Sequence, residues 1–304
     1  MKEIAEFRVP EEKVVRYLQS GEGVTLSGKV RKLSLPLHDP LVSRIVCLHQ
    51  ELLKKGDYFY LYSNIHREYR QQELAAAKAL RIVIRRVFEP TGEECGTSYS
   101  DVAMCEYCGV GGEQVSDLIL DPRSLPDSNR LSIAKTISGE IIVSHTFQKL
   151  WRETAMRGAE FKHIRHNKNR GVIIPEWYQL KIVSEPVSIM APTRAGTTPF
   201  DDRCIVSHQA HLSKDVEVPG TWCDRNKQYE CPRGHTIGLN LYSELSIEKL
   251  EQGCMWDLTA TRQFIGVRRG VLRPESLLVC SRRFRECISQ TGLKGMSFEV
   301  VHFV

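Results

Sequence analysis

Two short cysteine-containing segments could bind a metal ion. The first reads Cys105-Glu-Tyr-Cys108-Gly109, and the second reads Cys231-Pro-Arg-Gly-His235. In Cys-x-x-Cys-Gly two thiolates can face one ion across a tight turn, and the glycine lets backbone amides approach the sulfur atoms. The second segment offers a thiolate and an imidazole around a turn that contains Pro and Gly. The sequence therefore predicts one tetrahedral Zn²⁺ site with the ligands Cys105, Cys108, Cys231 and His235.

Other residues could complete the same site. Cys95 could join the first pair, Cys223 could replace the histidine, and His208 and His211 are a further pair of candidate ligands. Ten cysteines in a chain that we expect in the cytoplasm favour metal ligation over disulfides. Four cysteines in apolar contexts are predicted to be small core residues. They are Cys47, Cys254, Cys280 and Cys287.

The sequence shows no coherent set of catalytic side chains. His163 and His166 stand beside asparagines but lack an acidic or metal-binding partner at a suitable spacing, so we interpret them as part of a polar loop. Cys204 with His208 and His211 could hold a catalytic metal, but no glutamate stands at the spacing of a general base. No phosphate-binding or dinucleotide-binding glycine loop appears. We therefore expect a protein that is not an enzyme.

A longer pattern occurs twice, at a constant offset and without gaps. Each copy has an apolar run, a serine that can cap a helix, an amphipathic helical segment, a glycine and a second apolar segment. The pattern predicts strand, helix and strand in both copies, with both helical phenylalanines buried and each glycine at a left-handed helix end. The matching residues are Ser144, Phe147, Gly158 and Phe161 in the first copy, and Ser281, Phe284, Gly295 and Phe298 in the second.

These patterns predict an α+β fold, namely a duplicated zinc-knuckle plus strand-helix-strand module with an N-terminal α+β extension. Residues 1–79 are the expected extension, 80–170 the first knuckle module, 171–220 a bridging strand and loop, and 221–304 the second knuckle module. A chain of 304 residues is long enough to bury a substantial core.

Within and just after the N-terminal extension, the spacing of apolar residues and the positions of glycine and proline predict four helices and strands. Residues 41–55 have apolar residues at helical spacing and stop at Gly56. Residues 58–62 are mostly aromatic and are typical of a strand. A second helix is expected from 67 to 79, followed by a strand from 80 to 88.

Charge is only locally informative. The formal net charge of +5 comes from 42 basic and 37 acidic residues. Basic residues crowd the end of each repeat, where they could bind nucleic acid or an acidic protein or form a solvated face. Among them Arg282 and Arg283 are our candidates for contact with a partner, because fork-shaped guanidinium groups often anchor polar interfaces. No apolar run approaches a membrane span and the first residues lack a signal sequence, so we expect a cytoplasmic protein with no membrane contact.

The two knuckles and the paired strand–Ser–helix–Gly–Phe units resemble the bacterial double-CXXCG motif proteins over about residues 80–304. The chain is similar, more loosely, to immunity proteins of polymorphic toxin systems. It departs from the pattern at Cys231-Pro-Arg-Gly-His235, where Cys-x-x-Cys-Gly would stand. The resemblance implies a toxin-neutralising or other protein-binding role.

Three functions therefore remain open. The leading expectation is a non-enzymatic, zinc-stabilised protein that binds a protein partner such as a toxin or a defence-system component at a fixed molar ratio. The alternative is a zinc-ribbon protein that binds nucleic acid through the arginine clusters. The third is an enzyme whose site has no recognisable motif.

Overall fold

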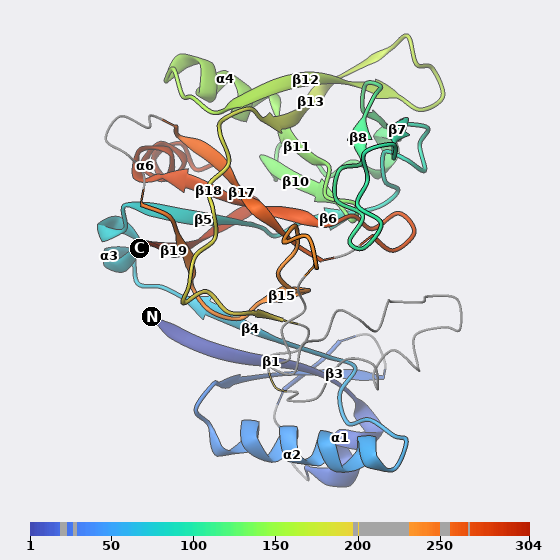
Figure 1. Ribbon diagram of the computed structural model, residues 1–304, viewed down its shortest axis with the longest axis vertical. Helices are drawn as coiled ribbons and strands as arrows, with labels where there is room; N and C mark the ends of the chain where they lie inside the picture. The colour runs from blue at the N-terminus through green and yellow to red at the C-terminus, as the bar shows by residue number, and fades with distance from the viewer. Residues whose placement is uncertain (19–22, 27–28, 197–199, 201–230, 250–255, 267) are drawn as a thin grey trace.

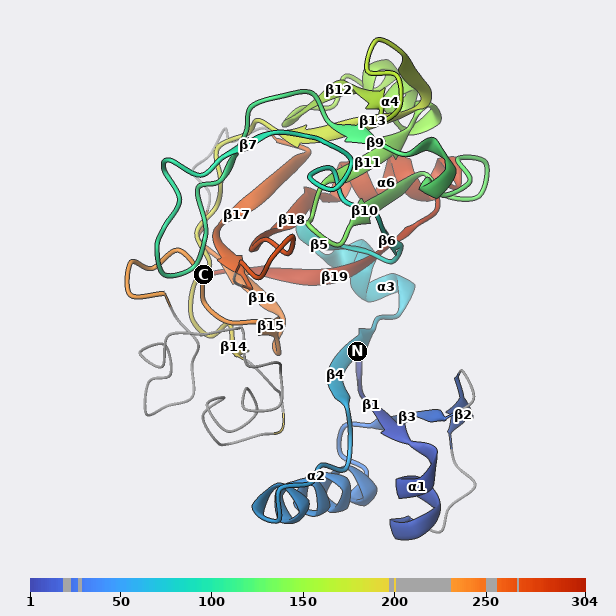
Figure 2. The ribbon, with the colours of Figure 1, turned by 90° about the vertical axis from the view of Figure 1, so that its right-hand side faces the viewer.

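The computed structural model describes residues 1–18, 23–26, 29–196, 200, 231–249, 256–266 and 268–304 (Figure 1). Helices and strands are mixed along the chain, which confirms the α+β class. An N-terminal sheet with two helices lies at one end of the molecule, and two further sheets form the larger body (Figures 1 and 2).

The N-terminal part is a four-stranded antiparallel sheet with the order β2-β3-β1-β4 and two helices on one face. Its chain order, strand–helix–strand–strand–helix–strand, is the split βαβ arrangement. Ala5, Phe7 and Leu33 on the sheet pack against Val42 and Ile45 on the second helix. The elements are β1 (Lys2–Pro10), α1 (Glu11–Tyr17), β2 (Val24–Thr25), β3 (Val30–Pro36), α2 (Pro40–Lys54) and β4 (Tyr62–Glu68).

The predicted helix at 41–55 is confirmed by α2, but the predicted strand at 58–62 is wrong. The buried ring of His49 stacks on Tyr60, and its Nδ1 accepts hydrogen bonds from the amides of Phe59 and Tyr60 at 3.1 and 3.3 Å. These amides are therefore engaged by a side chain, and the strand begins only at Tyr62. The next helix, α3 (Gln71–Ala76), is shorter than predicted because β4 continues to Glu68.

The first body sheet has the strand order β6-β10-β11-β13-β12-β9. A short hairpin of β7 and β8 lies beside it, and α4 packs against β11 and β13. The elements are β6 (Val87–Phe88), β7 (Tyr99–Ser100), β8 (Glu113–Gln114), β9 (Ile119–Leu120), the 3₁₀ turn Pro122–Ser124, β10 (Ile133–Thr136), β11 (Ile141–Ser144), α4 (His145–Glu153), β12 (Ala159–His166) and β13 (Ile173–Ile182).

The second body sheet has the strand order β16-β19-β5-β18-β17. The predicted strand at 80–88 is divided between the sheets, because β5 joins this one and β6 joins the first. The elements are β5 (Ala79–Ile84), β14 (Ala195–Gly196), β15 (Asn240–Leu241), β16 (Leu245–Ile247), β17 (Leu258–Ile265), β18 (Glu275–Ser281), α6 (Arg282–Thr291) and β19 (Met296–Phe303).

The two body sheets have corresponding middle strands. β13 lies between β11 and β12, and β5 lies between β18 and β19, antiparallel to both neighbours in each case. The registers also correspond, because Phe161 faces Leu180 in the first sheet as Phe298 faces Ile82 in the second. Both copies of the pattern thus follow strand, helix, strand, but each pair of strands is separated by a strand from outside the copy.

The central core lies between the two body sheets. Phe147 and Trp151 of α4 meet Phe284 of α6, with ring centroids 6.0 and 6.1 Å from Phe284. Phe147 is 1 % exposed and Phe284 is fully buried, as predicted. Ser144 and Ser281 cap the two helices by accepting a hydrogen bond from the amide three residues on.

The two glycines of the pattern do not end the helices, which corrects the prediction. α4 ends at Glu153, and the left-handed cap of α6 is Gly292. Gly158 and Gly295, at φ +110° and +108°, instead pass close to the other sheet: a Cβ would lie 1.9 Å from the carbonyl oxygen of Leu258 in the first case and 2.4 Å from that of Ile133 in the second. These residues begin β17 and β10, so the contact is reciprocal.

Phe147→Ala and Phe284→Ala should each lower the free energy of unfolding by about 3 to 5 kcal/mol, because each leaves a cavity between the sheets. Denaturant unfolding measures the loss. Leu61→Ala is the control, since that side chain is 56 % exposed and its removal should change stability little. If either phenylalanine variant lost less unfolding free energy than the control, the proposed packing of that ring between the sheets would be contradicted.

Gly158→Ala and Gly295→Ala should destabilise far more than Gly292→Ala. All three glycines have positive φ, but a methyl group at Gly292 would meet no described atom within 4 Å, so its substitution carries only the conformational cost of about 1 to 2 kcal/mol. At the other two positions a methyl group would displace a backbone carbonyl. Equal losses by thermal unfolding in all three variants would show that the close approach is unimportant.

Candidate metal centre

The two knuckles meet in space. The first lies between β7 and β8, and the second lies just before β15. Their ligand atoms, from Cys105, Cys108, Cys231 and His235, all lie within 4.8 Å of one another. The three cysteines are buried and the histidine is half-buried. The predicted set is therefore brought together, two ligands from each knuckle, and it could hold a metal ion.

The distances fit a tetrahedral ion. Cys105 Sγ lies 3.9 Å from Cys231 Sγ, and Cys108 Sγ lies 3.7 Å from Nδ1 of His235. Bonds of about 2.3 Å to a tetrahedral ion place two sulfur atoms about 3.8 Å apart. Three thiolates and an imidazole are a donor set that suits such an ion, and all four come from the protein.

Backbone amides point at the sulfur atoms. The amide of Arg233 donates to Cys231 Sγ at 3.4 Å, and those of Tyr107 and Cys108 donate to Cys105. Gly109 and Gly234 both adopt positive φ, +72° and +73°, which turns the chain around the ligands. Such N–H donors stabilise thiolate charge, so the knuckles are shaped for the ionised form of cysteine.

The thiols differ in pKa because they are crowded. Burial alone would raise the pKa of Cys105, but the amides of Cys108 and Tyr107, together with His235, lower it to about 6. Burial and the neighbouring thiols of Cys231 and Cys105 raise the pKa of Cys108 to about 12. A divalent ion would offset the repulsion between neighbouring thiolates.

Arginines of the β17–β18 hairpin hold the first knuckle in place. The amide of Arg268 donates to the carbonyl oxygen of Cys108 at 3.1 Å, and its guanidinium lies 2.6 Å from Asp101. The guanidinium of Arg273 bonds Glu93 at 2.9 Å and lies 3.9 Å from the ring centroid of Tyr99. From the sequence these arginines are predicted only as members of a basic cluster. Their spacing along the chain does not indicate that they contact other side chains of the protein.

The other candidate ligands and the predicted core cysteines differ in position and burial. Cys95 is half-buried and outside the four-residue group, and burial raises the pKa of its thiol. Cys223, Cys204, His208, His211 and Cys254 lie outside the described residues. Among the predicted core cysteines, Cys280 is fully buried and Cys287 is half-buried. Cys47 is exposed, contrary to prediction, because α2 turns Val42, Ile45, His49 and Leu52 inward instead.

The candidate partner arginines are both about half exposed but differ in their contacts. Within the described part of the chain, Arg282 pairs with Glu286 alone, one turn along α6, at 2.7 Å. Arg283 binds Asp257 at 3.2 Å and the carbonyl oxygen of Thr154, so it also fastens α6 to the end of α4. The predicted polar loop at His163 and His166 is wrong, because both residues lie in strand β12 and the loop begins only after His166, which accepts a hydrogen bond from the amide of Lys168.

Protein purified under reducing conditions should contain close to one metal atom per chain. Cys105→Ser and Cys231→Ser should each lose the metal and several kcal/mol of stability, because binding energy at such a site contributes directly to folding. Elemental analysis and thermal unfolding check both effects. Cys47→Ser is the matched control and should retain both. Metal-free, equally stable wild-type protein would contradict the site.

No helix in the described part of the chain is long and apolar enough to cross a membrane. No protein-family model matches the chain, and no curated protein matches it. The functional argument therefore rests on the cluster of Cys105, Cys108, Cys231 and His235 and on its surroundings.

Proposed function

We propose that the four clustered side chains bind one Zn²⁺ and that this ion is structural. The observation that carries the proposal is the convergence of all four ligand atoms within 4.8 Å. Three thiolates and an imidazole are typical of structural zinc, and four protein ligands leave no position for a catalytic water. On this proposal the ion acts as a crosslink between segments far apart in the sequence.

We also propose that the body arose by duplication of one knuckle plus strand-helix-strand unit. The corresponding registers of β13 and β5 support this, as do the reciprocal contacts of Gly158 and Gly295. The amide of Asp257 donates to the carbonyl oxygen of Arg157, and the amide of Ser132 donates to that of Lys294, in the same reciprocal manner. The ligands divide equally between the proposed units.

The function that these features support best is stoichiometric binding of a protein partner. A crosslinked scaffold with a fully ligated ion suits recognition better than turnover, because the ion can neither activate water nor polarise a substrate. The resemblance to double-CXXCG and immunity proteins favours a toxin or another defence-system component as the partner, in a bacterial cytoplasm. Arg282 is the better contact candidate of its pair, since Arg283 is committed to Asp257 and Thr154.

Titration of a candidate toxin, beginning with the products of neighbouring genes, tests this proposal. Protection should saturate near a fixed molar ratio, and Arg282→Ala should weaken binding by about tenfold or more, in the manner of an interface anchor. His163→Ala is the matched control on an exposed basic side chain and should bind normally. Neutralisation by far less than one equivalent would indicate an enzyme and overturn the proposal.

The alternative function is nucleic-acid binding through the loop between β12 and β13. Lys168 and Arg170 are exposed in this loop and Lys162 is exposed on β12, whereas Arg268 and Arg273 of the second cluster are engaged with carboxylates. Phosphate contacts would give an affinity that falls linearly with salt on logarithmic axes. A titration that shows this slope, and its loss in Lys162→Gln with Lys168→Gln, would favour the alternative over protein binding.

A further inference from the structure

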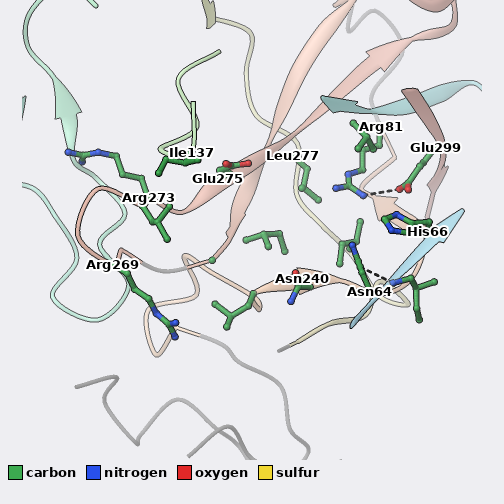
Figure 3. Close-up of a pocket in the computed structure, with 17 residues that line it drawn as sticks. Asn64, His66, Arg81, Ile137, Asn240, Arg269, Arg273, Glu275, Leu277 and Glu299 are labelled. Carbon is green, nitrogen blue, oxygen red and sulfur yellow. Dashed lines mark hydrogen bonds and ion pairs between the residues drawn. The ribbon is translucent and has the colours of Figure 1, made fainter. Parts of the chain in front are cut away.

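An open cavity of about 460 Å³ lies on the outer face of the second body sheet, away from the metal centre (Figure 3). Its floor is formed by Arg81, Val83 and Leu277, and its sides come from β4, β15 and the turn before β18. The volume is that of a small-molecule site, and charged and polar side chains line it together with apolar ones.

The first body sheet shows what normally covers this face. There, Gln179 and Lys181 hydrogen-bond the side chain of Gln114 at 2.7 to 3.1 Å, and Glu140 accepts the hydroxyl of Tyr99 at 2.7 Å. The chain itself thus provides partners for these polar groups.

In the second sheet the same face is left open. By register, Arg81 stands where the first sheet has Gln179, and Leu277 stands where it has Glu140. In the sequence, Asn240 follows Cys231 by the same number of residues as Gln114 follows Cys105. The asparagine side chain is one methylene group shorter than that of glutamine. Arg81, Leu277 and Asn240 all line the cavity (Figure 3). The cavity is therefore the counterpart of a position that is filled in the first sheet.

The carboxylates that line the cavity are already paired. Glu299 bonds Arg81 at 2.8 Å and lies 3.9 Å from Arg67, and Glu275 bonds Lys135. The guanidinium of Arg273 points away from the cavity, toward Tyr99 (Figure 3). Within the described residues, no carboxylate pairs with Arg269.

Among the residues that the structure describes, one guanidinium at the cavity has no acidic partner. Nε of Arg81, Arg269 and Arg273 and Nη1 of Arg273 are each buried without a hydrogen-bond partner among the described residues, so these atoms do not face the open cavity. Of the three arginines, only Arg269 pairs with no carboxylate within the described part of the chain. A guanidinium can only donate, so a group in the cavity that pairs with Arg269 must be an acceptor, and the charge favours an anionic one.

We propose that this cavity binds a small organic anion. Its carboxylate or phosphate head bonds Arg269, and its apolar body lies along Val83, Leu241 and Leu277. The site is separate from the metal cluster and from Arg282, so it does not depend on the function proposed above.

Isothermal titration of the metal-loaded full chain tests the site with two sets of probes, benzoate and its 4-hydroxy derivative for carboxylates, and the four ribonucleoside 5′-monophosphates for phosphates. At least one probe should bind saturably at one per chain. Arg269→Gln should weaken it about 10- to 100-fold, the loss of one charge-assisted hydrogen bond. Arg269→Lys, which keeps the charge but not the fork, should be intermediate.

Arg262→Gln is the matched control, because Arg262 is an exposed arginine of β17 that does not line the cavity. It should leave binding unchanged, and all three variants should keep the wild-type unfolding temperature in the absence of probe to within a few degrees. Failure of every probe to bind would overturn the proposal. Equal weakening by Arg262→Gln would show nonspecific attraction and would overturn it too.

Discussion

The architecture depends on where the two middle strands come from. β5 lies ahead of both strand-helix-strand segments in the chain, yet it hydrogen-bonds β18 and β19 at the C-terminal end. β13, by contrast, follows its strand-helix-strand segment in the chain and pairs with both strands of that segment in the first sheet. The second sheet therefore cannot form until β18 and β19, near the C-terminal end, pair with β5. Bringing these distant segments together closes a long loop, and this costs conformational entropy before the new contacts offset it.

The proposed ion would act on this constraint. Cys105 and Cys108 follow β5, while Cys231 and His235 precede β16, so a shared ion would shorten the loop that the second sheet must close. The hairpin that carries Arg268 reaches from the second sheet to the first knuckle and holds it from the other side. On this proposal, sheet closure and ligand placement favour each other, in keeping with the burial of the three cysteines.

Much of the local structure could be predicted from the sequence. Ser144 and Ser281 indicate helix starts, and the two cysteine knuckles indicate a group of four side chains that could hold a metal ion. The insertion of β13 and β5 between the strands of the two copies could not be predicted, because an apolar run indicates a strand buried on two faces but does not identify its neighbours in the sheet. The role of Gly158 was missed for a related reason: a positive φ suits both a helix end and a close approach, and only the position of Leu258 distinguishes them. A basic residue such as Arg283 gives no sequence signal of whether it pairs internally.

The two body sheets have corresponding middle strands but differ on their outer faces. On the first sheet, Gln114 hydrogen-bonds Gln179, and Tyr99 hydrogen-bonds Glu140. On the second sheet, Arg81, Leu277 and Asn240 stand at the positions that correspond to Gln179, Glu140 and Gln114, and they line an open cavity. Because the metal cluster and the Phe147–Phe284 contact lie elsewhere, changes on this face need not disturb the elements that hold the sheets together. On the proposed duplication, one copy of this surface serves packing and the other is open to the proposed ligand.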